Sequence, residues 1–217
     1  MFKKPVRGAD RSTQSRIAAV ASTLFAAKGY NGVSLRAIAT GAGVPLGLIP
    51  YYFGSKAGLY RALWESWMGK VPAATLLRKA PMPAGASRET RIRRVVQAFF
   101  EGPRMLLLEA GGAQFVAIMV REAHDPSAAS RGLVQEFIRP NARRFRAELA
   151  RLLPDMDARA FDAGIEMMVS ALRIAIERRS DGSARAPDAA RVQRLFDVLT
   201  EFVVGGWMRL VAGRRQR

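Results

Sequence analysis

The 217-residue chain contains no cysteine and a single histidine, His124. Without cysteine it can form no disulfide, offers no thiolate ligand to a metal and has no cysteine nucleophile. One histidine excludes a histidine-rich metal cluster and leaves no obvious nucleophile–base pair. We therefore expect no metal and no other cofactor. An enzyme that processes small molecules, with the amino-terminal helices only as a scaffold, is the less favoured alternative.

Long hydrophobic runs are also missing. The longest strictly apolar run covers residues 115–120, far short of the roughly 18 residues that a membrane span needs. The basic start of the chain has no apolar run behind it, so it does not resemble a secretory signal. A composition of 49% hydrophobic and 24% charged residues is that of a globular protein with a core. The sequence predicts a cytoplasmic protein with no membrane partner.

Acidic residues are scarce at the amino end. Residues 1–80 hold 12 Lys and Arg against two acids, whereas residues 81–217 hold 23 against 16, and the whole chain carries a formal charge of +17. A dense positive charge attracts polyanions, so nucleic acid is the first candidate partner. An anionic lipid surface is the second, but it would need an amphipathic helix with an exposed apolar face.

Apolar residues recur at helical spacing almost throughout, and no alternating strand pattern competes with them. The sequence predicts an all-α fold in which an amino-terminal helix-turn-helix domain precedes a larger helical domain. Glycine and proline clusters mark the divisions. They separate a basic arm (1–11), a DNA-binding domain (12–71) and a ligand-binding and dimerisation domain (72–217), with a linker at 80–86.

The larger domain is expected to contain longer helices. Ser87 caps one that ends near Glu101, and Gly102-Pro103 separates it from one or two helices that reach about residue 123, interrupted at residues 111–112. Asp125-Pro126 is expected to start a helix that Pro140 kinks. Asp155 or Asp157 opens the next helix, residues 180–187 form a polar turn, and the last helix runs to about residue 210.

Residues 33–60 contain the pattern of a helix-turn-helix, in which the second helix enters the DNA major groove. Small residues stand where two helices must approach closely, and four apolar residues can hold the pair together: Ile38, Val44, Ile49 and Phe53. Side chains that can donate to phosphates flank them. These donors are Ser34, Arg36, Tyr51, Tyr52 and Lys56.

A dehydrogenase motif overlaps the same segment. The glycines at 41, 43 and 47 resemble a dinucleotide-binding turn, and Tyr52 with Lys56 matches a Tyr-x-x-x-Lys pair. A dinucleotide turn requires a strand before it, whereas a capped helix stands there. The Tyr-Lys pair also lies within 17 residues of the first glycines, which leaves no room for the intervening strands. The glycines are therefore interpreted as turn residues.

A string of matched positions makes residues 12–65 resemble the DNA-binding domain of TetR-family transcriptional regulators. The residues that carry the resemblance are Phe25, Gly29-Tyr30, Ser34, Ile38-Ala39, Ala42-Gly43-Val44, Tyr52-Phe53, Gly54-Ser55-Lys56 and Leu59. Further along, Arg121-Glu122, Asp125-Pro126 and residues 138–140 look like the ligand-binding domain of one subgroup. The resemblance implies a homodimeric repressor that a small molecule releases from a palindromic DNA operator.

The resemblance and the residue types together predict where DNA is bound. The predicted DNA-binding residues are Ser34, Arg36, Pro45, Leu46, Gly47, Leu48, Tyr51, Tyr52 and Lys56. The family usually has polar residues near 46 and 48 and an aromatic residue at 50, where this chain has Leu46, Leu48 and Pro50. Leucines can touch thymine methyl groups but form no hydrogen bonds with base edges. We therefore expect readout to depend more on Arg36, DNA shape and an arm containing Lys3, Lys4, Arg7 and Arg11, unless that arm is only a tail.

In the larger domain the candidates are less specific. The ligand candidates are Met105, Met119, His124 and Met168, with core filling as the alternative for the methionines and a helix cap for the histidine. The Arg139–Arg151 arginines are expected on a solvated face. The last two helices carry long apolar stripes that predict the dimer surface, with the monomer core as the alternative. The predicted dimer residues are Phe161, Ile165, Leu172, Phe196, Leu199 and Phe202.

Overall fold

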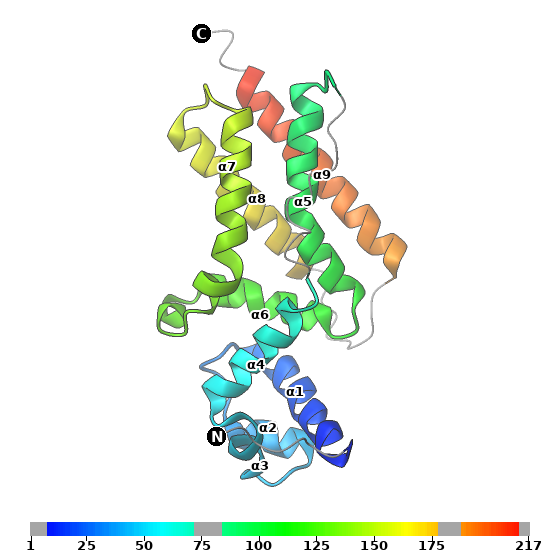
Figure 1. Cartoon of the computed structure of the whole chain (residues 1–217), viewed down its shortest axis with the longest axis vertical. Helices are drawn as coiled ribbons and strands as arrows, with labels where there is room; N and C mark the ends of the chain where they lie inside the picture. The colour runs from blue at the N-terminus through cyan, green and yellow to red at the C-terminus, as the bar shows by residue number, and fades with distance from the viewer. Residues whose placement is uncertain (1–7, 72–83, 178–187, 213–217) are drawn as a thin grey trace.

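The computed structural model describes residues 8–71, 84–177 and 188–212. Over these ranges the chain is helical and contains no strand, so the predicted all-α fold is confirmed. The amino-terminal helices form the lower part of the molecule in Figure 1, and a bundle of longer helices forms the upper part. Helix α6 runs across the foot of the bundle, between the two parts.

The amino-terminal part consists of α1 (Gly8–Lys28), α2 (Leu35–Ala42), α3 (Leu48–Phe53) and α4 (Lys56–Met68). Two serines begin α2 and α4 as predicted, because each hydroxyl accepts a hydrogen bond from a backbone N–H of the first turn. Ala37 N–H donates to Ser34 Oγ over 3.1 Å, and Gly58 N–H donates to Ser55 Oγ over 3.0 Å. These caps fix where the short helices start.

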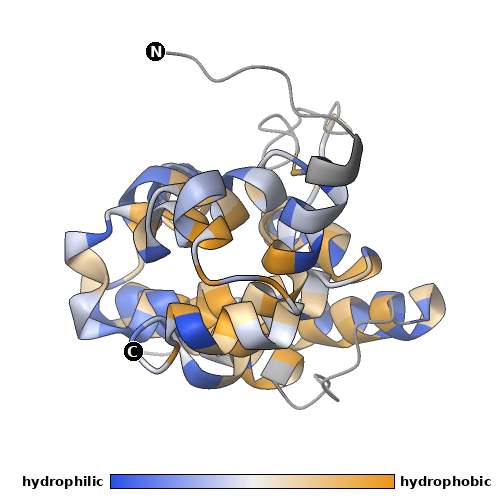
Figure 2. Cartoon of the chain, turned by 90° about the horizontal axis from the view of Figure 1, so that it is seen from below, coloured by the Kyte–Doolittle hydropathy of each residue, from blue (hydrophilic) through white to orange (hydrophobic). Residues whose placement is uncertain are grey.

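The larger part consists of α5 (Arg88–Leu108), α6 (Gly112–His124), α7 (Arg139–Leu152), α8 (Ala158–Glu177) and α9 (Ala189–Ala212). Between α6 and α7 lie a 3₁₀ turn, η2 (Pro126–Ser130), and a π turn, η3 (Val134–Ile138). Figure 2 shows hydrophobic and hydrophilic segments along the same helices, as expected for amphipathic helices around a core. The core side chains of both parts form one continuous cluster.

The predicted break at Gly102-Pro103 is wrong, because α5 continues through both residues to Leu108. Proline removes one backbone donor from a helix interior, which is normally unfavourable. Here the following turn buries Leu106 and Leu107 completely or nearly so, and Gly102 is buried as well. Packing against the core therefore keeps the helix continuous where local preference predicts its end. The predicted interruption at residues 111–112 is correct, since Gly111 precedes α6 with φ +81°.

The helix expected to start at Asp125 is wrong in its start, because it begins at Leu133. Asp125 does act as an N-cap, since its carboxylate accepts the Ser127 N–H over 2.8 Å, but it starts only the η2 turn. Gly132 follows with φ +69°, a left-handed conformation that ends the turn. Leu133, η3 and α7 form one uninterrupted run of helical residues that ends at Leu152, and Pro140 lies two residues after the π turn within this run. A proline next to a π turn is a usual cause of a bend within a helix, in agreement with the kink that the sequence predicts at Pro140.

Helices α8 and α9 pack closely on each other within one chain. A Cβ atom added to Gly164 would lie 2.5 Å from the Trp207 ring, so glycine is required for this approach. Trp207 also packs against Phe161, with ring centroids 5.5 Å apart, and Phe196 packs against Phe100 of α5 at 5.9 Å. Apolar residues on the inner faces of α8 and α9 therefore complete the core of the single chain.

This packing corrects four of the six predicted dimer residues. Phe161, Leu172, Phe196 and Leu199 are each less than a tenth exposed and belong to the monomer core, the alternative that the sequence left open. Ile165 is partly buried against the same core, whereas Phe202 is 69% exposed. The apolar stripe is wider than one packing face, and its inner half is used within the chain.

Several predictions concern residues outside the described ranges. They include the arm residues Lys3, Lys4 and Arg7, residues 80–83 of the linker and the polar turn at 180–187. Arg11 lies in α1 and is exposed. The arginines at positions 139, 143, 144, 146 and 151 are exposed as expected of a solvated face.

Candidate nucleic-acid interface

Helices α2 and α3 are joined by a tight turn whose geometry depends on glycine. Gly43 has φ +59°, a left-handed conformation that a residue with a Cβ atom rarely adopts. Its neighbour Val44 donates its N–H to the Ala39 carbonyl over 3.0 Å, which closes the carboxyl end of α2. Ile38 and Ile49 are fully buried between the helices, with Val44 and Phe53 partly buried beside them. This is the helix-turn-helix that the sequence predicts.

Pro50 does not disrupt α3. It is the third residue of the helix, where the backbone N–H has no partner within the helix in any case. Tyr51 N–H donates to the Gly47 carbonyl over 3.2 Å, and Gly54 N–H donates to the Pro50 carbonyl over 2.9 Å. The expected loss of a helical hydrogen bond therefore does not occur.

The predicted DNA-binding residues share an exposed surface along α2 and α3. Ser34, Arg36, Pro45, Leu46 and Gly47 are exposed, and Tyr51 has 55% of its surface accessible. Leu48, Tyr52 and Lys56 are partly buried, and the Tyr52 ring packs edge-on against Tyr51 at 5.1 Å. Leu46 is apolar and 45% exposed. The surface combines hydrogen-bond donors with an apolar centre.

Lys56 lies at the amino end of α4, next to the recognition helix. Its ammonium group is 4.4 Å from the centre of the Tyr30 ring, a distance typical of a cation–π contact. Burial lowers the pKa of Lys56 from its ordinary value, and the nearby positive charge of Arg131 lowers it further. The Arg131 guanidinium lies 4.7 Å from the centre of the same ring. Tyr30 therefore contacts one cation from each part of the molecule.

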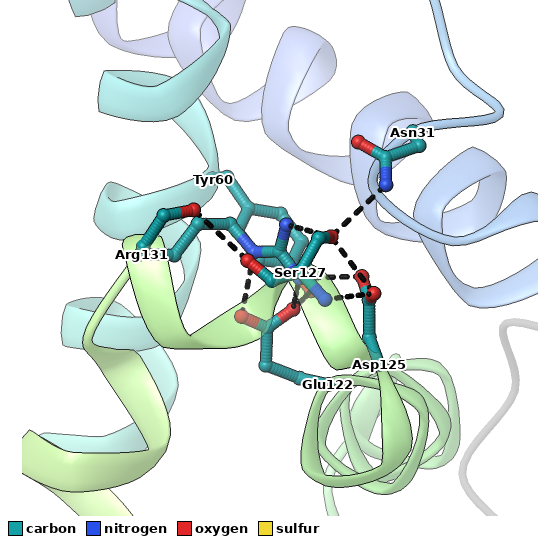
Figure 3. A network of polar contacts seen from close by, with 7 residues as sticks. Asn31, Tyr60, Glu122, Asp125, Ser127 and Arg131 are labelled. Atoms are coloured by element: carbon teal, nitrogen blue, oxygen red, sulfur yellow. Dashed lines mark hydrogen bonds and ion pairs between the residues drawn. The ribbon is translucent and has the colours of Figure 1, made fainter.

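A buried polar network joins the two parts behind this surface (Figure 3). Glu122 of α6 is 2% exposed and accepts hydrogen bonds from two sides. The Tyr60 hydroxyl of α4 donates to its Oε2 over 3.0 Å, and Arg131 donates from Nε to Oε1 over 2.7 Å and from Nη2 to Oε2 over 2.9 Å. Asp125 accepts a further Arg131 hydrogen bond over 2.5 Å. We call Tyr60, Glu122, Asp125 and Arg131 the Glu122 clasp.

A second bridge extends the clasp to the end of α1. Asn31 donates from Nδ2 to Ser127 Oγ over 3.1 Å, and Arg131 donates to the same oxygen over 2.9 Å. The sequence pointed to Glu122 through the family resemblance and to Asp125 as a helix cap, but not to Tyr60 and Arg131 as their partners. The signal was weak, because Arg131 follows a turn whose path only the structure defines.

Tyr60 gives the clasp a dependence on alkaline pH. Burial raises its pKa well above the ordinary 10.0, and the charge of Glu122 together with the hydrogen bond to it raises the pKa further. As the pH rises, the unfolded chain therefore loses this proton before the folded protein does. The contribution of Tyr60 to stability is fully present below about pH 10 and is lost as the pH rises further. Since Tyr60 stays protonated in the folded protein, Tyr60→Phe is expected to leave the tyrosinate absorbance of the folded protein near pH 10 unchanged. A smaller tyrosinate signal in the variant would show that Tyr60 ionises normally.

An apolar cavity of about 200 Å³ lies on the other side of α6. Phe99, Leu106, Phe137 and Leu172 are among its walls, and Asn141, His124 and Arg173 are the polar residues there. Two of the predicted ligand residues, Met119 and His124, line this cavity, whereas Met105 and Met168 do not. The Nδ1 atom of His124 also lies 2.8 Å from the Val120 carbonyl oxygen. This contact fits the role at the helix end that the sequence left open.

The described ranges contain neither a membrane-spanning helix nor a cluster of metal ligands. None of the helices that the structure describes is both long and apolar enough to cross a membrane. Within the same ranges, no three His, Asp or Glu side chains are grouped so that they could hold a metal ion.

These features match known families in both parts of the chain. Residues 17–63 match the family described as bacterial regulatory proteins of the tetR family, and residues 97–206 match the family described as the tetracyclin repressor-like C-terminal domain. The first match covers the helix-turn-helix, and the second covers most of the helical bundle that contains the cavity.

Known regulators resemble the chain over most of its length. The HTH-type transcriptional regulator BetI of Paraburkholderia phymatum is 30% identical over 149 residues, which cover 66% of this chain and 70% of that protein. The BetI of Burkholderia mallei is 28% identical over 148 residues, covering 66% and 71%. A TetR-like regulator from Rhodococcus sp. RHA1 has the same fold, with a TM-score of 0.57 at 20% identity, covering 94% of this chain and 99% of that one. A mutant of the regulator HlyIIR superposes with a TM-score of 0.58 at 19% identity, covering 91% and 99%.

The two family matches identify a helix-turn-helix transcriptional regulator that binds DNA, a class of protein that is not an enzyme. With both domains matched, the chain belongs to the TetR family.

Proposed function

We propose that the protein is a cytoplasmic, homodimeric repressor that binds a palindromic operator and releases it when a small molecule occupies the cavity above α6. The observation that carries this proposal is the helix-turn-helix surface with Arg36 and Lys56 at its edges, at the most basic end of the chain. The division at residues 71 and 72 remains our proposed domain boundary.

The exposed side chains of the surface suggest how DNA is held. Arg36 and Lys56 can bind phosphates or a base edge, and the Ser34 hydroxyl can do the same although it also caps α2. The α3 residues that face outward are mostly apolar, so contacts to thymine methyl groups accompany few hydrogen bonds to bases. We expect DNA shape to contribute a large part of the sequence preference.

Two substitutions test this docking model. Duplexes selected from a random pool by the wild-type protein are expected to be palindromic, and their affinity should fall steeply as salt rises. Arg36→Ala combined with Lys56→Ala should weaken binding by roughly a hundredfold and lower the slope of log affinity against log salt by about two. Each phosphate contact releases about one counterion on binding, so the loss of two contacts lowers the slope by about two.

The matched control removes two other arginines. Arg143→Ala with Arg144→Ala deletes the same charge from the exposed face of α7, and its affinity and salt slope should stay close to those of the wild type. Equal losses in both double variants would mean that net charge and not the helix-turn-helix surface determines binding, and the docking model would be rejected.

A second exposed surface supports the homodimer. On α8, Met167 is 68% and Ile174 46% exposed, and on α9 Val198 is 68% and Phe202 69% exposed. Val198 and Phe202 are four residues apart, so they form one stripe on the outer face of α9. A Cβ atom added to Gly205 would meet no atom within 4 Å, so the surface beside this stripe is open. A second copy of the chain would bury these residues about a two-fold axis.

The cavity supports a small effector. Its volume of about 200 Å³ is below the roughly 300–1,000 Å³ of pockets for drug-sized molecules. A dry apolar cavity of about 150 Å³ accommodates a benzene molecule. The walls therefore suit a compact apolar molecule, with Asn141, His124 and Arg173 available for one polar group.

A further inference from the structure

We propose that Arg131 of the larger domain is a positioning residue for DNA binding, which holds Lys56 through Tyr30 and connects it through Glu122 to the cavity wall. This inference rests on the proposed function, since it concerns how the DNA contact is regulated. It assigns a role in DNA binding to the Glu122 clasp, beyond the contribution of the clasp to stability.

Lys56 and Arg131 are linked by the Tyr30 ring. Both cations lie over the Tyr30 ring, at 4.4 Å for the Lys56 ammonium and 4.7 Å for the Arg131 guanidinium. Tyr30 is itself packed among Phe25 at 6.0 Å and Tyr60 at 4.9 Å, so the ring has little freedom to move. Displacing Arg131 would therefore change the surroundings of the Lys56 side chain directly.

Hydrogen bonds hold the Arg131 side chain in one position. This side chain is 9% exposed and its guanidinium forms hydrogen bonds with Glu122, Asp125 and Ser127. Glu122 is buried in turn and also receives the Tyr60 hydroxyl. A buried charge that loses its partner is strongly unfavourable, so this arrangement tolerates little partial opening. The clasp should therefore hold one geometry or separate cooperatively.

Helix α6 connects the clasp to the cavity. Glu122 belongs to α6, and the same turn of that helix contributes Val120 and His124 to the apolar cavity. Val120, His124 and Arg173 also line a polar cleft of about 530 Å³ on the opposite side, next to Tyr30, Tyr60 and Glu122. The end of α6 is thus a wall between the cavity and the clasp. A molecule that fills the cavity would shift this wall and with it Glu122.

An exposed ion pair provides the comparison. Arg61 of α4 donates to Glu136 of η3 over 2.8 Å, so it also joins the two parts of the chain. Both side chains are close to half exposed, and such pairs contribute little because water competes for each charge. If any contact between the two parts of the chain supported DNA binding, loss of this pair would lower the affinity for DNA as much as loss of the clasp. The proposal requires that only the clasp matters.

The test measures affinity for the selected palindromic duplex in a double-mutant cycle. The paired variant Glu122→Gln with Arg131→Gln removes both charges, so the net charge of the protein stays the same. We expect it to weaken DNA binding about tenfold in the wild-type background and less than threefold in a Lys56→Ala background. The salt slope should fall by about one in the paired variant, as it does for Lys56→Ala alone.

Controls separate positioning from other effects. Glu136→Gln should bind within a factor of two of the wild type. Tyr30→Leu keeps the buried ion pair but removes the ring that both cations contact, so it should reproduce the tenfold loss. It answers the question even if the paired variant does not fold. Equal losses with and without Lys56, or an unchanged salt slope, would overturn the positioning role.

The connection to the cavity is tested without knowledge of the effector. Ala142 of α7 lines the cavity, and Ala142→Phe places a ring inside it as a built-in occupant. This change should weaken DNA binding at least fivefold in the wild type and less than twofold in the paired Gln variant. No effect, or equal effects in both, would overturn the connection. Failure of the wild-type protein to select any duplex would instead reject the proposed function itself.

Discussion

Replacing Val198 and Phe202 of α9 by aspartate is expected to convert the protein into a monomer and to lower operator affinity by at least about a hundredfold. Both side chains are more than two thirds exposed and lie on one stripe. A charge at the centre of an apolar interface cannot be paired or hydrated there, so dimers should not form. A monomer binds one half-site and loses the gain from linking two binding events, which is typically 10²–10⁴-fold.

Sedimentation or light scattering measures the mass, and binding to the selected duplex measures the affinity. Ala147→Asp with Ala150→Asp makes a matched pair of changes at exposed positions of α7, outside the proposed dimer surface. This control should remain dimeric and bind normally. A Val198 and Phe202 variant that stays dimeric would place the interface elsewhere on the chain.

Replacing Glu122 by alanine is expected to cause the largest loss of stability of any single change in the clasp. The carboxylate is buried and accepts hydrogen bonds from Tyr60 and Arg131. Its removal leaves Arg131 partly buried with Asp125 as its remaining acidic partner. Breaking a buried pair in this way costs about 3–5 kcal/mol of the free energy of unfolding. In a chain of this size we expect the melting temperature to fall by roughly 10 °C.

The measurement is thermal unfolding followed by circular dichroism. Glu136→Ala is the matched control, because it removes a carboxylate from the exposed Arg61 pair and should melt within error of the wild type. Similar melting temperatures for both variants would show that water reaches Glu122 and that the clasp is not closed in solution. The positioning role of Arg131 would then lose its structural basis.

Local sequence signals were sufficient for the helix-turn-helix. Ser34 and Ser55 cap helices through their own hydroxyls, and Gly43 adopts a left-handed conformation that few other residues allow. Each of these effects involves residues within a few positions of one another. The sequence could therefore predict α2, the turn and α3 without reference to the rest of the chain.

Tertiary packing decided the features on which local preference was silent or wrong. α5 continues through Pro103 because the turn that follows buries Leu106 and Leu107. The same helical spacing predicts an apolar face on α9, but it does not distinguish Phe196 in the core from Phe202 on the surface.

The sequence by itself determined the family, the all-α fold and the helix-turn-helix, because short-range caps and turns and the spacing of apolar residues specify them. Only the tertiary structure brought Tyr60, Glu122 and Arg131 together. These residues are 62 and nine positions apart along the chain, and their contact depends on how α4 packs against α6 and on the path of the η2 turn. A buried charge network of this kind has no periodicity that a sequence can display, since each partner is selected by the geometry of the packed helices.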